Sequence, residues 1–219
     1  MRASDIPKAI RILRQEYGRF KTPYVSEVSA GKGKDPFKVL VSCILSLRTK
    51  DDVTREASMR LFRIAGTPQK ISRLTVKEIE KTIYPAGFYR VKSGVIRGIS
   101  RELAENHDGR VPDTMEGLLK LKGVGRKTAN LVVTMGYGKP GICVDTHVHR
   151  IANRWGFVST KTPDETESAL RKKLDKRYWI VLNGLLVAFG QNVCRPVSPF
   201  CGRCRLNGFC RRVGVLKSR

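Results

Sequence analysis

The sequence predicts an all-α protein. Apolar side chains recur every three or four residues along most of the 219 residues, as they do on the buried face of a helix. Three positions carry a capping residue followed three places later by Glu, a signature of helix N-termini: Thr75, Asp113 and Thr162. No alternating apolar and polar run of the kind that marks a strand exceeds four residues. With 41% hydrophobic residues, the chain can bury a core as one domain or as two small ones.

The first half of the chain contains three predicted helices. An apolar stripe over 6–17, formed by Ile6, Ile10, Leu13 and Tyr17, predicts one face of an N-terminal helix. The capping box of Thr75 and Glu78 begins a short helix, which Pro85 ends. Apolar residues at every fourth position from 91 to 103 predict a longer helix whose opposite face is basic.

The second half contains three more predicted helices. Asp113 is the expected N-cap of one, with Glu116 completing the box. Thr162 is the expected N-cap of another, and Pro163 suits its first position because that N–H needs no partner. The stretch 178–189 is apolar nearly all round, which predicts a buried helix.

The charge balance favours a polyanionic partner. Lys and Arg number 43 against 19 Asp and Glu, so the formal net charge is +24. Such a surplus repels itself in a compact protein and is typical of nucleic-acid binding. A membrane-spanning segment is excluded, because the apolar runs 39–47 and 185–189 fall far short of the ~20 residues of a spanning helix, and nucleic acid rather than a membrane is the expected partner. No apolar signal segment follows Arg2.

The segment LKLKGVGRKTA, residues 119–129, predicts two helices joined by a glycine turn. We expect the first helix to end at Lys122, Gly123 to adopt a left-handed conformation, and the second to begin near Gly125. Backbone N–H groups at such a turn can hold a phosphate without reading base sequence. By spacing alone a plain helical hairpin is an equal alternative, but the flanking lysines and arginines favour phosphate. The expected DNA-binding residues here are Lys122, Gly123, Val124, Gly125 and Arg126.

The six cysteines fall into two groups. Cys43 and Cys143 lie in apolar surroundings and are expected to be small buried side chains. The other four form a C-x6-C-x2-C-x5-C pattern near the end of the chain: Cys194, Cys201, Cys204 and Cys210. In a reducing compartment such a cluster indicates a metal site. From the chemistry of the thiolates, zinc and an iron–sulfur cluster are both possible ligands.

These motifs together resemble a known family. LKGVGRKTAN followed by VDTHVHR resembles the helix-hairpin-helix and Gly/Pro-Asp signature of the endonuclease III family of DNA glycosylases, and the resemblance extends over about residues 6–211. It implies that Lys127 is the catalytic nucleophile and Asp145, 18 residues later, the catalytic carboxylate. It also implies that the four C-terminal cysteines bind a [4Fe–4S] cluster.

The resemblance further implies an architecture and an activity. We expect two helical lobes with a DNA cleft between them: a six-helix domain over 31–137 with the hairpin, and a cluster domain of 1–30 plus 138–219. We expect a monomeric, cytoplasmic enzyme, associated with chromosomal DNA, that acts on duplexes with damaged bases or abasic sites. It would release a base, oxidised pyrimidines foremost, and cleave the strand by β-elimination through a lysine Schiff base.

Two further residues are candidates for DNA contact. The segment LSLRTKD resembles the family's LSxQTxD motif, but Arg48 replaces the glutamine that fills the gap left by a flipped nucleotide. Arg48 either fills that gap or contacts a phosphate. Phe88 stands where the family places an apolar wedge, and it is either such a wedge or a core aromatic. His147 and His149 have no second histidine pair near them in the sequence and are not expected to bind metal.

Two other functions compete with this prediction. A mismatch glycosylase for adenine or thymine is the first, but adenine-mismatch enzymes generally lack the lysine and carry a further C-terminal domain. A non-catalytic DNA-binding scaffold is the second, but a scaffold has no need of Asp145 at this spacing from Lys127.

Overall fold

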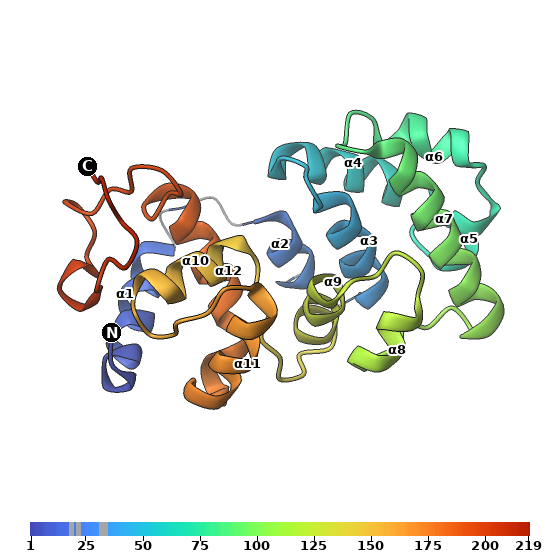
Figure 1. Ribbon diagram of the computed structural model, residues 1–219. Coiled ribbons are helices and arrows are strands. Elements are labelled where there is room, and N and C mark those ends of the chain that lie inside the picture. The colour runs from blue at the N-terminus through green and yellow to red at the C-terminus, as the bar shows by residue number, and fades with distance from the viewer. Residues whose placement is uncertain (18–19, 21–22, 31–34) are drawn as a thin grey trace. The chain divides into compact units, whose positions relative to one another are not determined.

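The computed structural model describes residues 1–219 except 18–19, 21–22 and 31–34. Within these described residues every regular element is a helix and none is a strand, which confirms the all-α prediction (Figure 1). None of the helices in this part of the chain is both long and apolar enough to cross a membrane.

The chain divides into two compact units. One comprises Met1–Pro23 with Pro140–Arg219, and the other comprises Tyr24–Lys139. The predicted boundaries at 30/31 and 137/138 remain predictions, and residues 31–34 lie outside the described part of the chain. The predicted DNA cleft between the lobes likewise remains a prediction.

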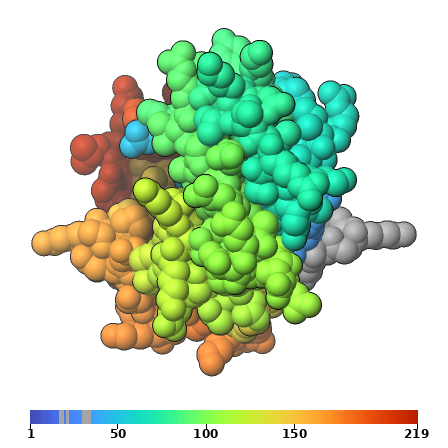
Figure 2. Space-filling model, turned by 90° about the vertical axis from the view of Figure 1, so that its right-hand side faces the viewer, coloured from blue at the N-terminus to red at the C-terminus, as the bar shows by residue number. Residues whose placement is uncertain are grey.

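The unit Tyr24–Lys139 is built around one buried helix. Its helices are α2 (Tyr24–Ala30), α3 (Pro36–Ser46), α4 (Asp51–Ile64), α5 (Pro68–Arg73), α6 (Val76–Ile83), α7 (Tyr89–Asn106), α8 (Met115–Lys120) and α9 (Arg126–Leu131), and α9 continues into the π-helical turn η2 (Val132–Gly136). Every residue of α3 from Val39 to Leu45 is buried, which accounts for the apolar run in the sequence. The long helix α7 packs against α5 and α6, and Figure 2 looks onto the side that these helices form with α8.

The other unit joins the N-terminal helix to the C-terminal half. Its elements are η1 (Ala3–Asp5), α1 (Ile6–Tyr17), α10 (Thr146–Arg154), α11 (Pro163–Lys173), η3 (Lys176–Tyr178), α12 (Trp179–Asn192) and η4 (Asn207–Phe209). Helix α12 packs against both α1 and α10, and Leu186 and Phe189 lie in their common core. The predicted buried helix over 178–189 is thereby confirmed. Leu206, from the cysteine-rich segment 194–219, also lies in this core and is only 1% exposed.

One predicted helix start was wrong by one residue. Thr114, not Asp113, is the N-cap of α8, and its side chain accepts the Gly117 N–H. The carboxylate of Asp113 instead pairs with the ammonium of Lys139, 26 residues away. The capping box of Thr75 and the cap at Thr162 form as expected.

Candidate functional site

The glycine hairpin lies between α8 and α9. Helix α8 ends at Lys120, two residues before the predicted end, and Gly125 is the N-cap of α9 as expected. Gly123 has φ +93°, and a Cβ there would lie 2.6 Å from Cγ1 of Val95 on α7. Both the left-handed backbone and this close approach therefore require glycine. Val124 is 7% exposed and anchors the turn.

The hairpin presents a group of accessible residues. Lys122, Gly123, Gly125 and Arg126 are exposed around the buried Val124. Lys127 is the second residue of α9 and is also exposed. No side chain caps this helix, so the turn offers backbone N–H groups and cations together.

Cys43 lies near Lys127 in the same unit, and it is inert. Its side chain is 1% exposed, and burial raises the pKa of this thiol to about 12. The nearby positive charge of Lys127 acts in the opposite direction without offsetting burial. Cys143, in the other unit, is 2% exposed. The prediction that both cysteines are small buried side chains is confirmed.

Asp145 is held in a defined orientation as the N-cap of α10. One carboxylate oxygen, Oδ1, accepts the N–H groups of His147 and Val148, each at 2.9 Å. The residue is 8% exposed. Because the helix start fixes one oxygen, the direction of the whole carboxylate is fixed. Lys127 belongs to the unit Tyr24–Lys139, and Asp145 belongs to the other unit.

The two histidines of this helix have polar partners of their own. His147 Nδ1 lies 3.1 Å from Nη2 of Arg150, and His149 Nδ1 lies 2.7 Å from Oγ1 of Thr166. Both therefore support the helix through hydrogen bonds.

The four C-terminal cysteines surround one cavity. Most of its other lining residues are apolar, among them Trp155, Phe189 and Phe200, but Arg154, Asn207 and Arg212 also line it; the cysteines are Cys194, Cys201, Cys204 and Cys210. Burial raises the pKa of the Cys204 thiol to about 11 and that of Cys210 in the same direction. Among the described residues, no three His, Cys, Asp or Glu side chains form a ready site for a single metal ion.

The chemistry of this donor set fits an iron–sulfur cluster. Burial disfavours the ionised form of a thiol, so four thiolates in this largely apolar cavity need compensating positive charge, which Arg154 and Arg212 supply in part and the irons of a cluster would complete. Hydrogen bonds to sulfur are also present: Arg212 N–H donates to Cys210 Sγ at 3.4 Å, and Arg154 Nη1 to Cys194 Sγ at 3.5 Å.

Two arginines that the sequence analysis missed organise this segment. Arg154, 9% exposed, donates to the carbonyl oxygens of Arg195 and Pro196, each at 2.6 Å. Arg150 donates to the Cys194 carbonyl at 2.9 Å, and burial lowers the pKa of its guanidinium. The sequence does contain a pattern that could have identified them: Arg150 and Arg154 are four residues apart on the helix that Asp145 begins, so both lie on one face of that helix.

The structure brings Arg48 and Phe88 together. The guanidinium of Arg48 lies over the Phe88 ring, 5.5 Å from its centroid. Phe88 is 60% exposed, so the core-aromatic alternative is wrong. Both residues have left-handed backbones, with φ of 50° and 57°. Their pairing was not predicted, because the two residues are 40 positions apart in the sequence and nothing local links the two segments.

A third residue of this region was missed. Lys92 was expected on the basic face of the helix over 91–103, yet it is only 6% exposed. Its ammonium donates to the Leu45 and Leu47 carbonyls and to Oγ1 of Thr49, at 2.7, 2.6 and 2.8 Å. Burial lowers the pKa of Lys92 to about 8.

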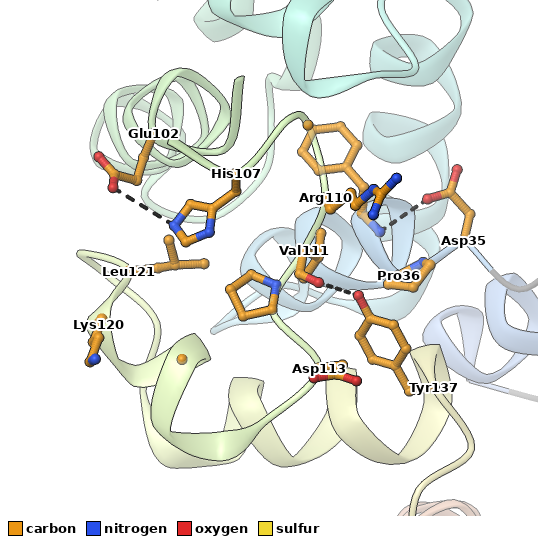
Figure 3. A pocket seen from close by; sticks show the side chains of 14 residues that line it. Asp35, Pro36, Glu102, His107, Arg110, Val111, Asp113, Lys120, Leu121 and Tyr137 are labelled. Atoms are coloured by element: carbon orange, nitrogen blue, oxygen red, sulfur yellow. Dashed lines mark hydrogen bonds and ion pairs between the residues drawn. The ribbon is translucent and has the colours of Figure 1, made fainter. Parts of the chain in front are cut away.

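A separate groove of about 730 Å³ lies between α3, α7 and α8. It contains none of the predicted site residues. Figure 3 shows that acidic, basic and neutral polar side chains line this groove. Glu102 lies 3.9 Å from His107, and the Tyr137 hydroxyl donates to the Val111 carbonyl. Asp35 and Asp113 also line it, so it does not suit a polyanion.

Comparison with known proteins identifies the family of the chain. A family model described as HhH-GPD superfamily base excision DNA repair protein matches residues 41–176. Endonuclease III of Thermotoga maritima is 49% identical over 179 residues, covering 82% of this chain and 84% of that one. Endonuclease III of Bacillus subtilis is 36% identical over 178 residues, covering 81% of each chain.

Solved structures give the same result. The structure of a trapped endonuclease III–DNA covalent intermediate matches with a TM-score of 0.84 at 30% identity, covering 97% of each chain. A thermostable thymine-DNA glycosylase matches with a TM-score of 0.73 at 22% identity, a likeness of fold alone. The chain belongs to the endonuclease III family, within the HhH-GPD superfamily of base excision DNA repair proteins.

Proposed function

We propose that this chain removes damaged bases, oxidised pyrimidines foremost, from duplex DNA and cleaves the resulting abasic strand through Lys127. The observation that carries the proposal is the exposed lysine in the first turn of α9, directly after a glycine turn that excludes any side chain. Backbone N–H groups of such a turn bind phosphate, which would bring the sugar of the same strand within reach of the amine.

The chemistry follows from the amine of Lys127. In its neutral form, the nitrogen donates its lone pair to C1′ of the sugar, and the bond from C1′ to the base breaks. The base leaves with that electron pair and takes up a proton. The C1′–O4′ bond then breaks, O4′ takes up the proton that the nitrogen loses, and the nitrogen lone pair forms the C1′=N double bond of a protonated Schiff base. Removal of a proton from C2′ then expels the 3′ phosphate, which cleaves the strand.

Asp145 would stabilise the positive charge that develops on the sugar as the base departs. Its orientation supports this role, because the N–H groups of His147 and Val148 hold one oxygen in place. A carboxylate that is already oriented need not reorganise when charge appears.

Arg48 and Phe88 would fill the space left when a nucleotide leaves the stack. An exposed aromatic ring with a guanidinium over its face supplies both a wedge and hydrogen-bond donors for an orphaned base. This pairing favours the gap-filling role of Arg48 over a phosphate contact, because its side chain is directed to the ring.

The four C-terminal cysteines would hold a [4Fe–4S] cluster. When bound, the cluster would add to the positive charge of Arg154 and Arg212 in stabilising four thiolates in a largely apolar cavity, and it would link distant parts of the segment. Zinc is the second candidate. Purified protein with broad visible absorption and about four irons per chain supports the cluster, and a colourless, zinc-loaded, active preparation contradicts it.

Borohydride trapping tests the lysine. Wild-type protein should form a covalent adduct with abasic-site duplex, whereas Lys127→Gln should form none and should release no base. Its DNA affinity should fall little, since several phosphate contacts remain. Lys77→Gln is the matched control: it removes one charge from an exposed position on α6 and should trap like wild type. An active Lys127→Gln variant would refute the Schiff-base assignment.

A panel of duplexes separates the competing functions. Thymine glycol and dihydrouracil should be the preferred substrates. Preference for adenine or thymine in mismatches would support the alternative glycosylase. Tight binding without base release or trapping would support the scaffold.

A further inference from the structure

We propose that Lys92 is a positioning residue that fixes Arg48 and Phe88 as one DNA-inserting unit. The inference rests on the proposed function of that pair. Arg48 follows α3 and Phe88 precedes α7, so contacts between these two segments must fix the position of one side chain relative to the other. The contacts of Lys92 reach both.

The ammonium of Lys92 brackets Arg48. It donates to the Leu47 carbonyl on one side of Arg48 and to Oγ1 of Thr49 on the other. Its third donor binds the Leu45 carbonyl, in the last turn of α3. All three protons of the ammonium are therefore used. The carbonyls that end a helix lack partners within it, so they form a natural site for a cation.

These hydrogen bonds to the residues on either side of Arg48 explain how Arg48 keeps its left-handed backbone conformation. A left-handed backbone, φ 50°, is unfavourable for a residue with a Cβ and persists only where the surroundings impose it. Because Lys92 holds both neighbours of Arg48, the turn between them is closed and Arg48 is directed outward.

The same residue holds the second segment. The backbone N–H of Lys92 donates to the Phe88 carbonyl at 3.0 Å. Oγ1 of Thr49, already bound by Lys92, also accepts the Gly87 N–H at 3.1 Å. A Cβ at Gly87 would lie 2.3 Å from the Arg48 carbonyl oxygen, so the two backbones touch. Lys92 thus ties Phe88 through its backbone and Arg48 through its side chain.

Burial makes this arrangement unusual. The oxygen atoms that Lys92 binds belong to two carbonyls and a hydroxyl, and none belongs to a carboxylate. A buried cation without an anionic partner is costly and occurs mainly where function requires it. The lowered pKa of Lys92 has the same cause, burial.

The test measures DNA insertion directly. A duplex with a tetrahydrofuran abasic analogue carries 2-aminopurine opposite the gap, so that its fluorescence rises when the base loses its stacking partners. Wild-type protein should raise this signal. Lys92→Met keeps the length of the side chain but removes the three bonds, and it should reduce the rise at least fivefold. Affinity for lesion-free duplex should change less than threefold, because phosphate contacts supply it.

Two variants make the result decisive. Arg97→Met is the matched control: Arg97 is on the same helix and donates to the Leu74 carbonyl at the end of α5, away from the inserting pair. It should give the wild-type rise. Thr49→Val removes the oxygen that Lys92 and Gly87 share, and it should reduce the rise even if Lys92→Met fails to fold. A wild-type signal in either folded Lys92→Met or Thr49→Val would overturn the proposal.

Failure of the proposed function would look different. If wild-type protein raises the fluorescence but forms no borohydride adduct, the assignment of Lys127 is wrong while the role of Lys92 stands. If it forms the adduct but raises no fluorescence, insertion by Arg48 and Phe88 is wrong and the proposal for Lys92 falls with it.

Discussion

At the scale of single residues, the important side chains are those whose neighbours leave them little freedom. Asp145 is an example, because it serves as a helix cap and as the proposed catalytic carboxylate at once. The first role needs one acceptor oxygen, and the second needs a negative charge. A substitution that keeps the acceptor and removes the charge separates them.

Asp145→Asn should therefore leave α10 intact and cripple base release. Asparagine caps helices about as well as aspartate, so the melting temperature should stay within a few degrees of wild type. Some borohydride trapping on a preformed abasic site should persist, because that step develops less charge. Single-turnover base release and trapping, measured on the same preparations, check both statements. Equal loss of stability and activity would show that the carboxylate acts mainly as a cap.

Lys92 gives a prediction for pH. Its pKa in the folded protein is about 8, below the ~10.4 of an unfolded lysine. The unfolded chain therefore binds the extra proton between these values, and stability increases as pH rises through this window. The free energy of unfolding of wild type relative to Lys92→Met should increase by up to about 3 kcal/mol between pH 8 and 10.4. Denaturant unfolding at several pH values tests this, and a constant difference would contradict it.

At the scale of elements, the hairpin between α8 and α9 depends on one glycine for two reasons. Gly123 combines a left-handed backbone with contact to Val95. Gly123→Ala should destabilise the protein by about 1–3 kcal/mol and weaken DNA binding, because the turn that presents the N–H groups is displaced. Adding Val95→Ala should relieve the clash but not the backbone strain. Full recovery of stability in the double variant would show that strain contributes nothing.

Periodicity and capping residues predicted α1, α6, α7, α8, α11 and α12, and glycine spacing predicted the hairpin, whereas α2 to α5 were not predicted. The family resemblance from the hairpin and VDTH motifs is confirmed by the comparisons. Long-range polar contacts were beyond local patterns. The ammonium of Lys92 donates to the Leu45 carbonyl, 47 residues away, and Asp113 pairs with Lys139 instead of capping α8. The pairing of Arg48 with Phe88 likewise depends on how α3 and α7 pack, which no short stretch of sequence encodes.

At the scale of the whole molecule, we expect the cysteine-rich segment to contribute both to stability and to DNA affinity. Leu206 is buried, but Val213 and Leu216 are 53% and 102% exposed, so burial of apolar side chains cannot order this segment. Arg195, Arg203 and Arg219 surround the Phe200 ring with centroid distances of 5.1, 4.1 and 5.2 Å. We expect the cluster to keep these cations in place.

Cys201→Ser should lose the cluster, disorder the segment and weaken DNA binding, while Tyr24–Lys139 stays mostly helical. Each lost phosphate contact should reduce the slope of log affinity against log salt by ~0.9 on duplex DNA. Circular dichroism and a salt titration of binding measure both effects. Cys143→Ser is the matched control, since that cysteine lies outside the cavity. An unchanged slope in cluster-free protein would show that the segment does not touch DNA.

Helix α10 has a mechanical consequence for the enzyme. Asp145 begins this helix, and Arg154, nine residues further on, grips the backbone of Arg195 and Pro196 at the other end. A helix of that length is a stiff rod of about 13 Å. If the cysteine-rich segment loses its order, Arg154 loses its partners, and the resulting displacement of α10 should change the position of the proposed catalytic carboxylate at the start of the same helix. Loss of the proposed iron–sulfur cluster should therefore lower the rate of base release from DNA that is already bound, in addition to lowering the affinity for DNA.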